Sequence, residues 1–364
     1  MKKLYYVVLF IVVSTYAQEK VNEQYTFDAN YFYGNVLTHN KTMKHLVTAH
    51  PQGFLLSVNK KTFGNKTWEA AYNYPDIGLS FHYQDLRNQT LGELFGLYAH
   101  YNFYFLNRNL VLRVGQGIAY NTNPYDKETN FRNIVYGTAI MPSTYFMLNY
   151  NKQNLWKGFG VQAGLSLFHH SNANIKAPNT STNTLAFNVG VNYTLDHEEI
   201  PVYKPFNDSI QFTEPIRYNV VFRTGISEND IINSGQFPFY VLSAYADKRI
   251  NRKSAIQLGA DVFWTKSLQE YIKFKSVAYP DENIDANTDY RKIGIFVGHE
   301  LFINKISVET QLGYYVYSPF DYLGRIYERV GMKYYINDNF YGALSLKAHG
   351  AKAEALELGI GIRF

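Results

Sequence analysis

The chain has 364 residues, among them 33 Tyr and 26 Phe, and only 18% of its residues are charged. It has no Cys, which excludes disulfides, thiolate metal sites and a cysteine nucleophile. The net charge of +5 is spread along the chain without basic runs, so nucleic acid is not expected as a partner.

Residues 1–17 have the pattern of a secretory signal peptide. Lys2 and Lys3 precede an unbroken apolar run over 4–13, and small residues lead to a cleavage position after Ala17. The apolar run is shorter than the roughly 20 residues that a membrane-spanning helix needs, which disfavours an anchor. We therefore leave residues 1–17 out of the fold.

After this segment the chain consists of runs in which apolar residues alternate with small or polar ones. In the run over 155–169, for example, Leu165 and Leu167 share one face, while Gly164 and Ser166 share the other. Alternation of this kind over about ten residues predicts β-strands. The sixteen runs cover 25–37, 53–63, 76–86, 91–106, 109–120, 138–150, 155–169, 183–195, 216–227, 237–248, 254–265, 291–302, 305–317, 326–336, 339–348 and 356–364.

These strands predict an all-β fold, and more closely a transmembrane antiparallel outer-membrane β-barrel. A soluble β-sandwich also alternates, but its strands are usually about 5–6 residues long, whereas a tilted strand crossing a bilayer needs about 9–11. We expect one barrel of roughly 12–16 strands, with 14 as the preferred number. The ending "LELGIGIRF", up to Phe364, resembles the C-terminal assembly signal of bacterial outer-membrane barrels.

Two stretches lack the alternation. The segment 196–215 is charged, carries three prolines and is predicted to be a long loop, and 268–290 is predicted to be a loop tip. The first loop divides the mature chain into residues 18–195 and residues 196–364, and we expect the second part to supply additional barrel strands. No metal or other cofactor is expected.

The stretch "FHHSNANIKAPNTSTN", over 168–183, separates two of the predicted strands. Continuing the apolar face past Leu167 gives His169 and then Ser171, and Asn183 opens the same face of the next strand. Polar residues on a lipid-facing row are costly unless they serve a function, although a hydrated strand end explains them too. If they are functional, the imidazole and the hydroxyl are a general base and a nucleophile within reach of each other.

An ester hydrolase also needs N–H groups aimed at the oxyanion that develops during the reaction. The side-chain amides of Asn172 and Asn179 can supply such donors, and so can the backbone amides of 173–175. Pro178 is expected to stiffen the return of the loop.

"HHSNANIKAPN", over 169–179, resembles the H-x-S-N-A-x-x-x-x-P-N signature of the lipid A 3-O-deacylase family, also called outer-membrane acyloxyacyl hydrolases. The resemblance covers roughly 45–195, and the segments 72–86 and 115–133 look like those of a longer subgroup in Bacteroidetes-type bacteria. It implies a barrel whose active site opens sideways to the outer leaflet of the bacterial outer membrane. It also implies hydrolysis of an ester-linked acyl chain of lipid A, in lipopolysaccharide, without a cofactor.

The resemblance assigns a role to each residue of the motif. It implies that Ser171 is the nucleophile, His169 its base and Asn172 an oxyanion donor. Asn179 would brace the loop or donate as well. Asn174 stands where the family has a Gly that lends its backbone N–H to the oxyanion hole, and Asn keeps that N–H.

Besides Asn174, the sequence departs from the family pattern at one more position. Asn183 stands where the family has the acid that orients the histidine. An Asn carbonyl can hold the imidazole tautomer but cannot stabilise the imidazolium with a charge. Asp126 and Glu128, in a preceding loop, are candidates to substitute for the missing acid.

The alternative is a non-catalytic outer-membrane barrel, a porin-like channel or transporter that keeps a degenerate site. Asn183 and the unmatched residues 196–364 favour it. Geometry separates the two hypotheses, since an esterase needs His169 and Ser171 outside the lumen, at the barrel end opposite the chain termini. The sequence does not predict an oligomeric state.

Overall fold

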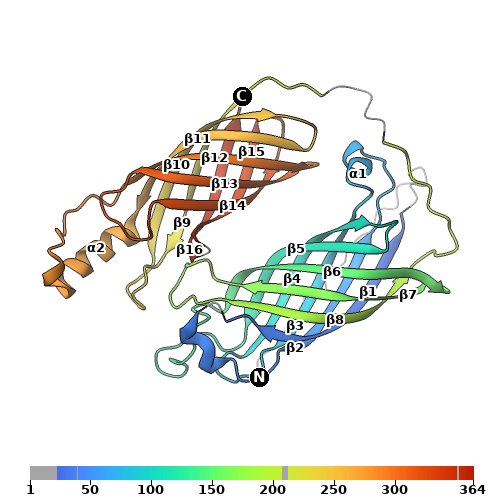
Figure 1. The fold of residues 1–364 in the computed structure, drawn as a ribbon, viewed down its shortest axis with the longest axis horizontal. Helices are drawn as coiled ribbons and strands as arrows, with labels where there is room; N and C mark the ends of the chain where they lie inside the picture. The colour runs from blue at the N-terminus through green and yellow to red at the C-terminus, as the bar shows by residue number, and fades with distance from the viewer. Residues whose placement is uncertain (1–22, 39, 207–211, 351) are drawn as a thin grey trace, which may run out of the picture.

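The computed structural model describes residues 23–38, 40–206, 212–350 and 352–364. Within these ranges the chain forms sixteen strands, arranged as two closed antiparallel barrels of eight strands each (Figure 1). The all-β prediction is confirmed. The prediction of a single barrel with 14 strands is wrong. All sixteen predicted runs become strands, and they form two separate sheets that each close on themselves. The predicted signal peptide, 1–17, lies outside the described residues.

The first barrel closes through the pairing of its first and last strands, in which Thr26 faces Thr194 and Val36 faces Thr184. The predicted strand over 155–169 is wrong at its start. Lys157 and Gly158 have φ of 47° and 87° and form a turn there, a conformation that glycine adopts without strain. The strands are β1 (Tyr25–Val36), β2 (Gln52–Lys60), β3 (Asp76–Asp85), β4 (Glu93–Phe105), β5 (Leu110–Asn121), β6 (Ile140–Trp156), β7 (Phe159–His170) and β8 (Thr182–Thr194).

The second barrel repeats this up-and-down order and closes where Thr224 faces Leu358 and Asn219 faces Arg363. Its strands are β9 (Arg217–Ser227), β10 (Phe237–Arg249), β11 (Ser254–Thr265), β12 (Lys292–Ile303), β13 (Ile306–Tyr317), β14 (Ile326–Tyr335), β15 (Phe340–His349) and β16 (Lys352–Arg363).

In the described part of the chain, four helices lie between the strands: η1 (Lys41–Leu46), α1 (Thr67–Ala71), α2 (Lys266–Ala278) and η2 (Pro280–Glu282). The prediction that 268–290 is irregular is therefore wrong in its first half. Leu268 and Ile272, one helical turn apart, are buried and hold α2 against the second barrel. No helix in the described ranges is both long and apolar enough to cross a membrane. The described part of 196–215 has neither helix nor strand, as predicted.

The two barrels point the same way. The first begins at Tyr25 and ends at Thr194 at one end, and the connecting segment leads to Arg217 at the end of the second barrel where the chain also finishes. We call this the terminal end and the opposite one the loop end. At the loop end lie the connections 37–51, 122–139, 171–181, 228–236 and 266–291, whereas one long connection within a barrel, 61–75 with α1, lies at the terminal end.

Side chains alternate between the outside and the lumen of each barrel. The outward ones are largely apolar and exposed, as at Leu165 (53%), Phe187 (58%) and Leu258 (65%). A closed barrel with an apolar exterior is the β-structure that satisfies every backbone hydrogen bond in lipid.

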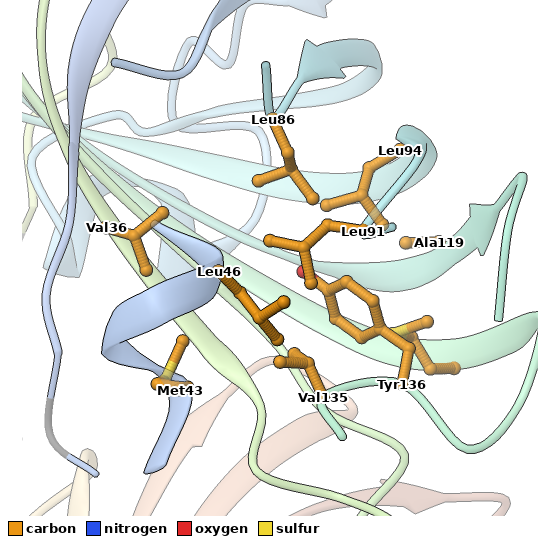
Figure 2. Close-up of a cluster of buried hydrophobic side chains, with 10 residues drawn as sticks. Val36, Met43, Leu46, Leu86, Leu91, Leu94, Ala119, Val135 and Tyr136 are labelled. Carbon is orange, nitrogen blue, oxygen red and sulfur yellow. The ribbon is translucent and has the colours of Figure 1, made fainter. Parts of the chain in front are cut away.

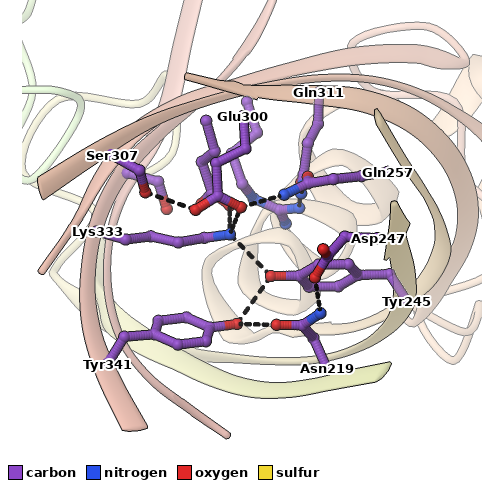
Figure 3. Close-up of polar contacts among 12 residues, drawn as sticks. Asn219, Tyr245, Asp247, Gln257, Glu300, Ser307, Gln311, Lys333 and Tyr341 are labelled. Atoms are coloured by element: carbon purple, nitrogen blue, oxygen red, sulfur yellow. Dashed lines mark hydrogen bonds and ion pairs between the residues drawn. The ribbon is translucent and has the colours of Figure 1, made fainter. Parts of the chain in front are cut away.

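Both lumens are filled by side chains. In the first barrel, the Arg113 guanidinium pairs with the Asp28 carboxylate at 2.6 Å. In the second, Lys333 contacts Glu300 at 2.8 Å within a network of charged and polar groups that crosses the interior (Figure 3). An eight-stranded barrel is just wide enough for side chains to fill it, so each interior is a packed polar core and not a wide aqueous channel.

A hydrophobic cluster closes the loop end of the first barrel (Figure 2). It is built from η1, the strand ends and the loop over 122–139, and its buried members are Val36, Met43, Leu46, Leu86, Leu91, Leu94, Ala119, Val135, Tyr136 and Met141. From this cluster the Tyr136 hydroxyl reaches the Thr182 hydroxyl at 2.7 Å, and Thr180 Oγ1 donates to the carbonyl of Ile134 at 2.9 Å. The cluster thus anchors the end of the loop that carries the predicted site.

Candidate active site

The register of β7 and β8 sets His169 directly opposite Asn183. His169 lies on the outward row with Leu167, whereas its neighbour His170 points into the lumen and is fully buried. Nδ1 of His169 is 2.7 Å from Oδ1 of Asn183. Because an amide oxygen only accepts hydrogen bonds, the contact assigns the ring proton to Nδ1 and the lone pair to Nε2, the tautomer that a general base requires.

Ser171 follows the end of β7, so it leaves the extended row and is 6% exposed. Its Oγ lies 3.1 Å from both the backbone N of Ala173 and Nδ2 of Asn179, and 3.2 Å from Oδ1 of Asn179. No hydrogen bond of the described residues joins it to His169. Both side chains line the same cavity, however, and catalytic hydrogen bonds of this kind often form only when substrate is bound.

The three asparagines between the strands hold the loop over 171–179, which carries the candidate nucleophile and which we therefore call the catalytic loop. Oδ1 of Asn179 accepts the N–H of Asn172 at 3.0 Å, and the side chain of Asn172 donates to the carbonyl of Lys176 at 2.7 Å. The amide of Asn172 is thus used within the loop and is not directed at the Ser171 hydroxyl. Asn174 has φ of 63°, which Asn tolerates better than most residues.

One backbone N–H of the turn around Asn174, that of Ala173, contacts the serine at its Oγ. The N–H of Asn174 enters none of the hydrogen bonds found among the described residues. A turn that directs successive amides toward one point can bind an anion, as an oxyanion hole must.

The two acids considered as substitutes for the missing one lie apart from His169. Oδ1 of Asp126 accepts the backbone N–H groups of Thr129, at 2.8 Å, and Glu128, at 2.9 Å. These hydrogen bonds lower the pKa of Asp126. Neither acid lines the cavity that holds His169, and the described contacts give the imidazole Asn183 as its orienting group.

The described residues contain no cluster of three or more His, Asp or Glu side chains arranged to hold a metal ion. The carboxylate-rich loop over 279–291, which follows α2, is another place where a cation could be expected, but Asp289 in it is bound by a protein side chain. The side chain of Arg291 donates to Asp289 at 3.0 Å, and this hydrogen bond lowers the pKa of Asp289 to about 2.

A cavity of about 930 Å³ opens over His169 and Ser171. One wall comes from η1 and the catalytic loop, and the other from the second barrel, which contributes Asp230, Ile232, Leu346 and Lys352. Sequence reasoning missed these second-barrel residues, since they lie far along the chain and carry no motif.

Fold and site together define a class of protein: a β-barrel with a serine and an oriented histidine at its rim, beside the apolar outer wall. Residues 52–192 match the family described as lipid A 3-O-deacylase (PagL), and residues 216–364 match the domain described as acyloxyacyl hydrolase, C-terminal domain. The two matches take in most of the first barrel and all of the second, and the chain belongs to this family of lipid A deacylases.

Other comparisons add little. No curated protein matches the chain in sequence. Variants of the porin of Rhodopseudomonas blastica align with 94% of this chain and 100% of their own, at 8–9% identity and with TM-scores of 0.17–0.18.

Proposed function

We propose that this protein is an outer-membrane deacylase that hydrolyses an ester-linked acyl chain of lipid A in lipopolysaccharide. One observation carries the proposal: Ser171 and an Asn183-oriented His169 line one cavity at the edge of the outer wall. Family membership supports the substrate class, because the first barrel matches the deacylase model over 52–192.

The apolar exteriors of both barrels support a location in the outer membrane. Barrels there have short turns on the periplasmic side and longer loops outside the cell. The terminal end of this protein would face the periplasm, and the loop end would place the catalytic loop at the outer leaflet, where lipid A lies. The predicted signal peptide, 1–17, is consistent with this route.

In the proposed reaction Ser171 Oγ attacks the ester carbonyl while Nε2 of His169 takes the hydroxyl proton. The oxyanion of the tetrahedral intermediate accepts the N–H of Asn174, and the Nδ1–H bond to Asn183 keeps the imidazole in place. His169 then protonates the departing alkoxide oxygen of the lipid, leaving an acyl-serine. A water molecule, deprotonated by the same imidazole, releases the fatty acid and restores the hydroxyl.

The acyl chain would lie along the outward row that leads to the site, over Leu167, Leu165 and Phe187. These side chains already face hydrocarbon, so an acyl chain that stays in the membrane is bound there with little desolvation. Lys41 and Lys352 line the cavity and suit an anionic head group. Lys176, in the catalytic loop itself, is a further cation near the site that could contact the phosphates.

The side chains that fill the lumens of both barrels argue against the alternative, a channel or transporter. Arg113 and Asp28 in the first lumen, and Lys333 and Glu300 in the second, are buried and paired. Such side chains obstruct the route that a solute would take through an eight-stranded barrel.

Mass spectrometry of lipid A tests the proposal. Cells expressing the wild-type chain should lose one ester-linked acyl chain from lipid A, and cells expressing Ser171→Ala at the same level in the outer membrane should not. Identical lipid A from both strains and from cells lacking the protein would exclude the proposed activity.

A further inference from the structure

We infer that the second barrel is a working part of the active site, and that Glu228 is a positioning residue that holds the catalytic loop in its reactive shape. The inference rests on the proposed function and extends it to a part of the chain that carries no catalytic motif.

Four hydrogen bonds join the catalytic loop to the loop over 228–236 of the second barrel. The N–H of Glu228 donates to the carbonyl of Asn174 at 3.1 Å, and Nδ2 of Asn174 donates to the carbonyl of Glu228 at 2.8 Å. The N–H of Ala177 donates to the Glu228 carboxylate at 2.8 Å. Gln236 Nε2 donates to the carbonyl of Ile175 at 2.9 Å. The second barrel therefore contacts three of the four residues over 174–177.

Glu228 is built into this junction. It is 2% exposed, and its second carboxylate oxygen accepts the N–H of Gly235 at 3.1 Å. A buried carboxylate is tolerated only where donors compensate for its lost hydration. Here the donors come from both barrels, so removing the carboxylate leaves the N–H of Ala177 without its partner and loosens the loop where the barrels meet.

These hydrogen bonds hold the residues that the proposed reaction needs. Asn174, whose N–H is the proposed oxyanion donor, is held through both its carbonyl and its side chain. Ala177 lies two residues before Asn179, which contacts the Ser171 hydroxyl. A displaced loop would thus misplace the oxyanion donor and the nucleophile together, and a displacement of about 1 Å can cost roughly 100-fold in rate.

The second barrel also closes the cavity. Ile232 and Leu346 form an apolar part of the wall facing the catalytic loop, with Lys352 and Asp230 paired at 2.7 Å beside them. A merely structural second barrel would not explain why its first loop is bonded to the residues around the nucleophile.

The test compares Glu228→Ala and Glu228→Gln with the wild type and with Glu270→Ala, a matched loss of a carboxylate on the exposed helix α2. Each full-length protein is purified in detergent micelles, and kcat and KM are measured with lipopolysaccharide as the substrate. The rate at which a fluorophosphonate labels Ser171 reports activation of the serine independently of lipid binding. Circular dichroism and heat-dependent gel mobility report whether the barrels are folded.

We expect Glu228→Ala to lower kcat roughly 10- to 100-fold and to slow labelling, with KM little changed and both barrels folded. Glu228→Gln keeps one acceptor oxygen, so its kcat and labelling rate should lie between those of Glu228→Ala and the wild type. Glu270→Ala should have the kcat and labelling rate of the wild type. Wild-type kcat and labelling in a folded Glu228→Ala protein would overturn the inference. If that variant does not fold, Glu228→Gln and Gln236→Ala decide by the same criterion.

Failure of the proposed function has a different signature. A wild-type protein that leaves lipopolysaccharide intact but reacts with the fluorophosphonate refutes lipid A as the substrate, and the labelling rates of the Glu228 variants still decide the inference. A wild-type protein that does neither refutes both.

Discussion

Replacing Asn183 with Asp tests how the imidazole of His169, the proposed general base, is held. Oδ1 of Asn183 lies 2.7 Å from Nδ1 of His169, and a carboxylate would keep an accepting oxygen in that place. It would add a negative charge facing the imidazolium that forms when His169 takes the serine proton. Since both residues would keep the same tautomer, the substitution changes the charge and leaves the geometry alone.

The gain can be estimated from the hydrogen bond. A bond to a charged group contributes about 1.5–3 kcal/mol and a neutral one about 1 kcal/mol, so the transition state should gain about 0.5–2 kcal/mol. That corresponds to an increase in kcat of roughly 2- to 30-fold. His169 is only half-buried, and solvent screening places the expected value in the lower part of this range.

The assay is the release of fatty acid from lipopolysaccharide in detergent micelles, followed from acidic to alkaline pH. A carboxylate beside the imidazole favours its protonated form, so the acid limb of the Asn183→Asp profile should move to higher pH. Asn183→Ala, which removes the orienting oxygen, should lower kcat across the profile. If Asp brings neither a faster reaction nor a shifted limb, and Ala retains full activity, residue 183 does not orient the base.

Two further predictions concern packing. Gly137→Val should slow deacylation while the barrels stay folded, because a Cβ at Gly137 would lie 2.5 Å from the carbonyl of Lys176 and displace the catalytic loop; Gly342→Ala, with nothing within 4 Å, is the control in the same assay. Asp28→Ala should lower the free energy of unfolding of the first barrel by about 3–5 kcal/mol, measured by urea titration in detergent, because Arg113 then stays buried without its partner. A cost near zero would mean that this lumen is wet and the pair weak.

The strands could be predicted from the sequence because their signal is local. Each run alternates over its own residues, as Leu165 and Leu167 do against Gly164 and Ser166, whatever lies beside it. The pairing that closes a barrel could not be predicted in this way. Whether β8 pairs with β1 or continues into β9 depends on contacts between residues as distant as Thr26 and Thr194, and alternation is the same in both cases. The strand pattern therefore predicted a barrel but not that there would be two.

In the candidate site too, local features could be predicted from the sequence and tertiary contacts could not. His169 and Asn183 lie on two adjacent strands, so strand register alone brings them together, whereas Ser171 follows the end of β7. The use of Asn172 to hold the carbonyl of Lys176 depends on the fold of the loop and was not predicted. Glu228 was also missed, because it meets the loop only through the packing of one barrel against the other.

Two barrels of eight strands offer something that one barrel of sixteen would not. A sixteen-stranded barrel encloses a water-filled channel, and its outer wall meets lipid on every side. Two narrow barrels have packed, rigid interiors, held here by pairs such as Arg113 with Asp28 and Lys333 with Glu300. The cavity over Ser171 is lined by residues of both, with loop residues of the first barrel on one side and Asp230, Ile232, Leu346 and Lys352 of the second on the other. The proposed deacylase would need such a place, because the loop carrying Ser171 must be fixed in position and still open to lipid.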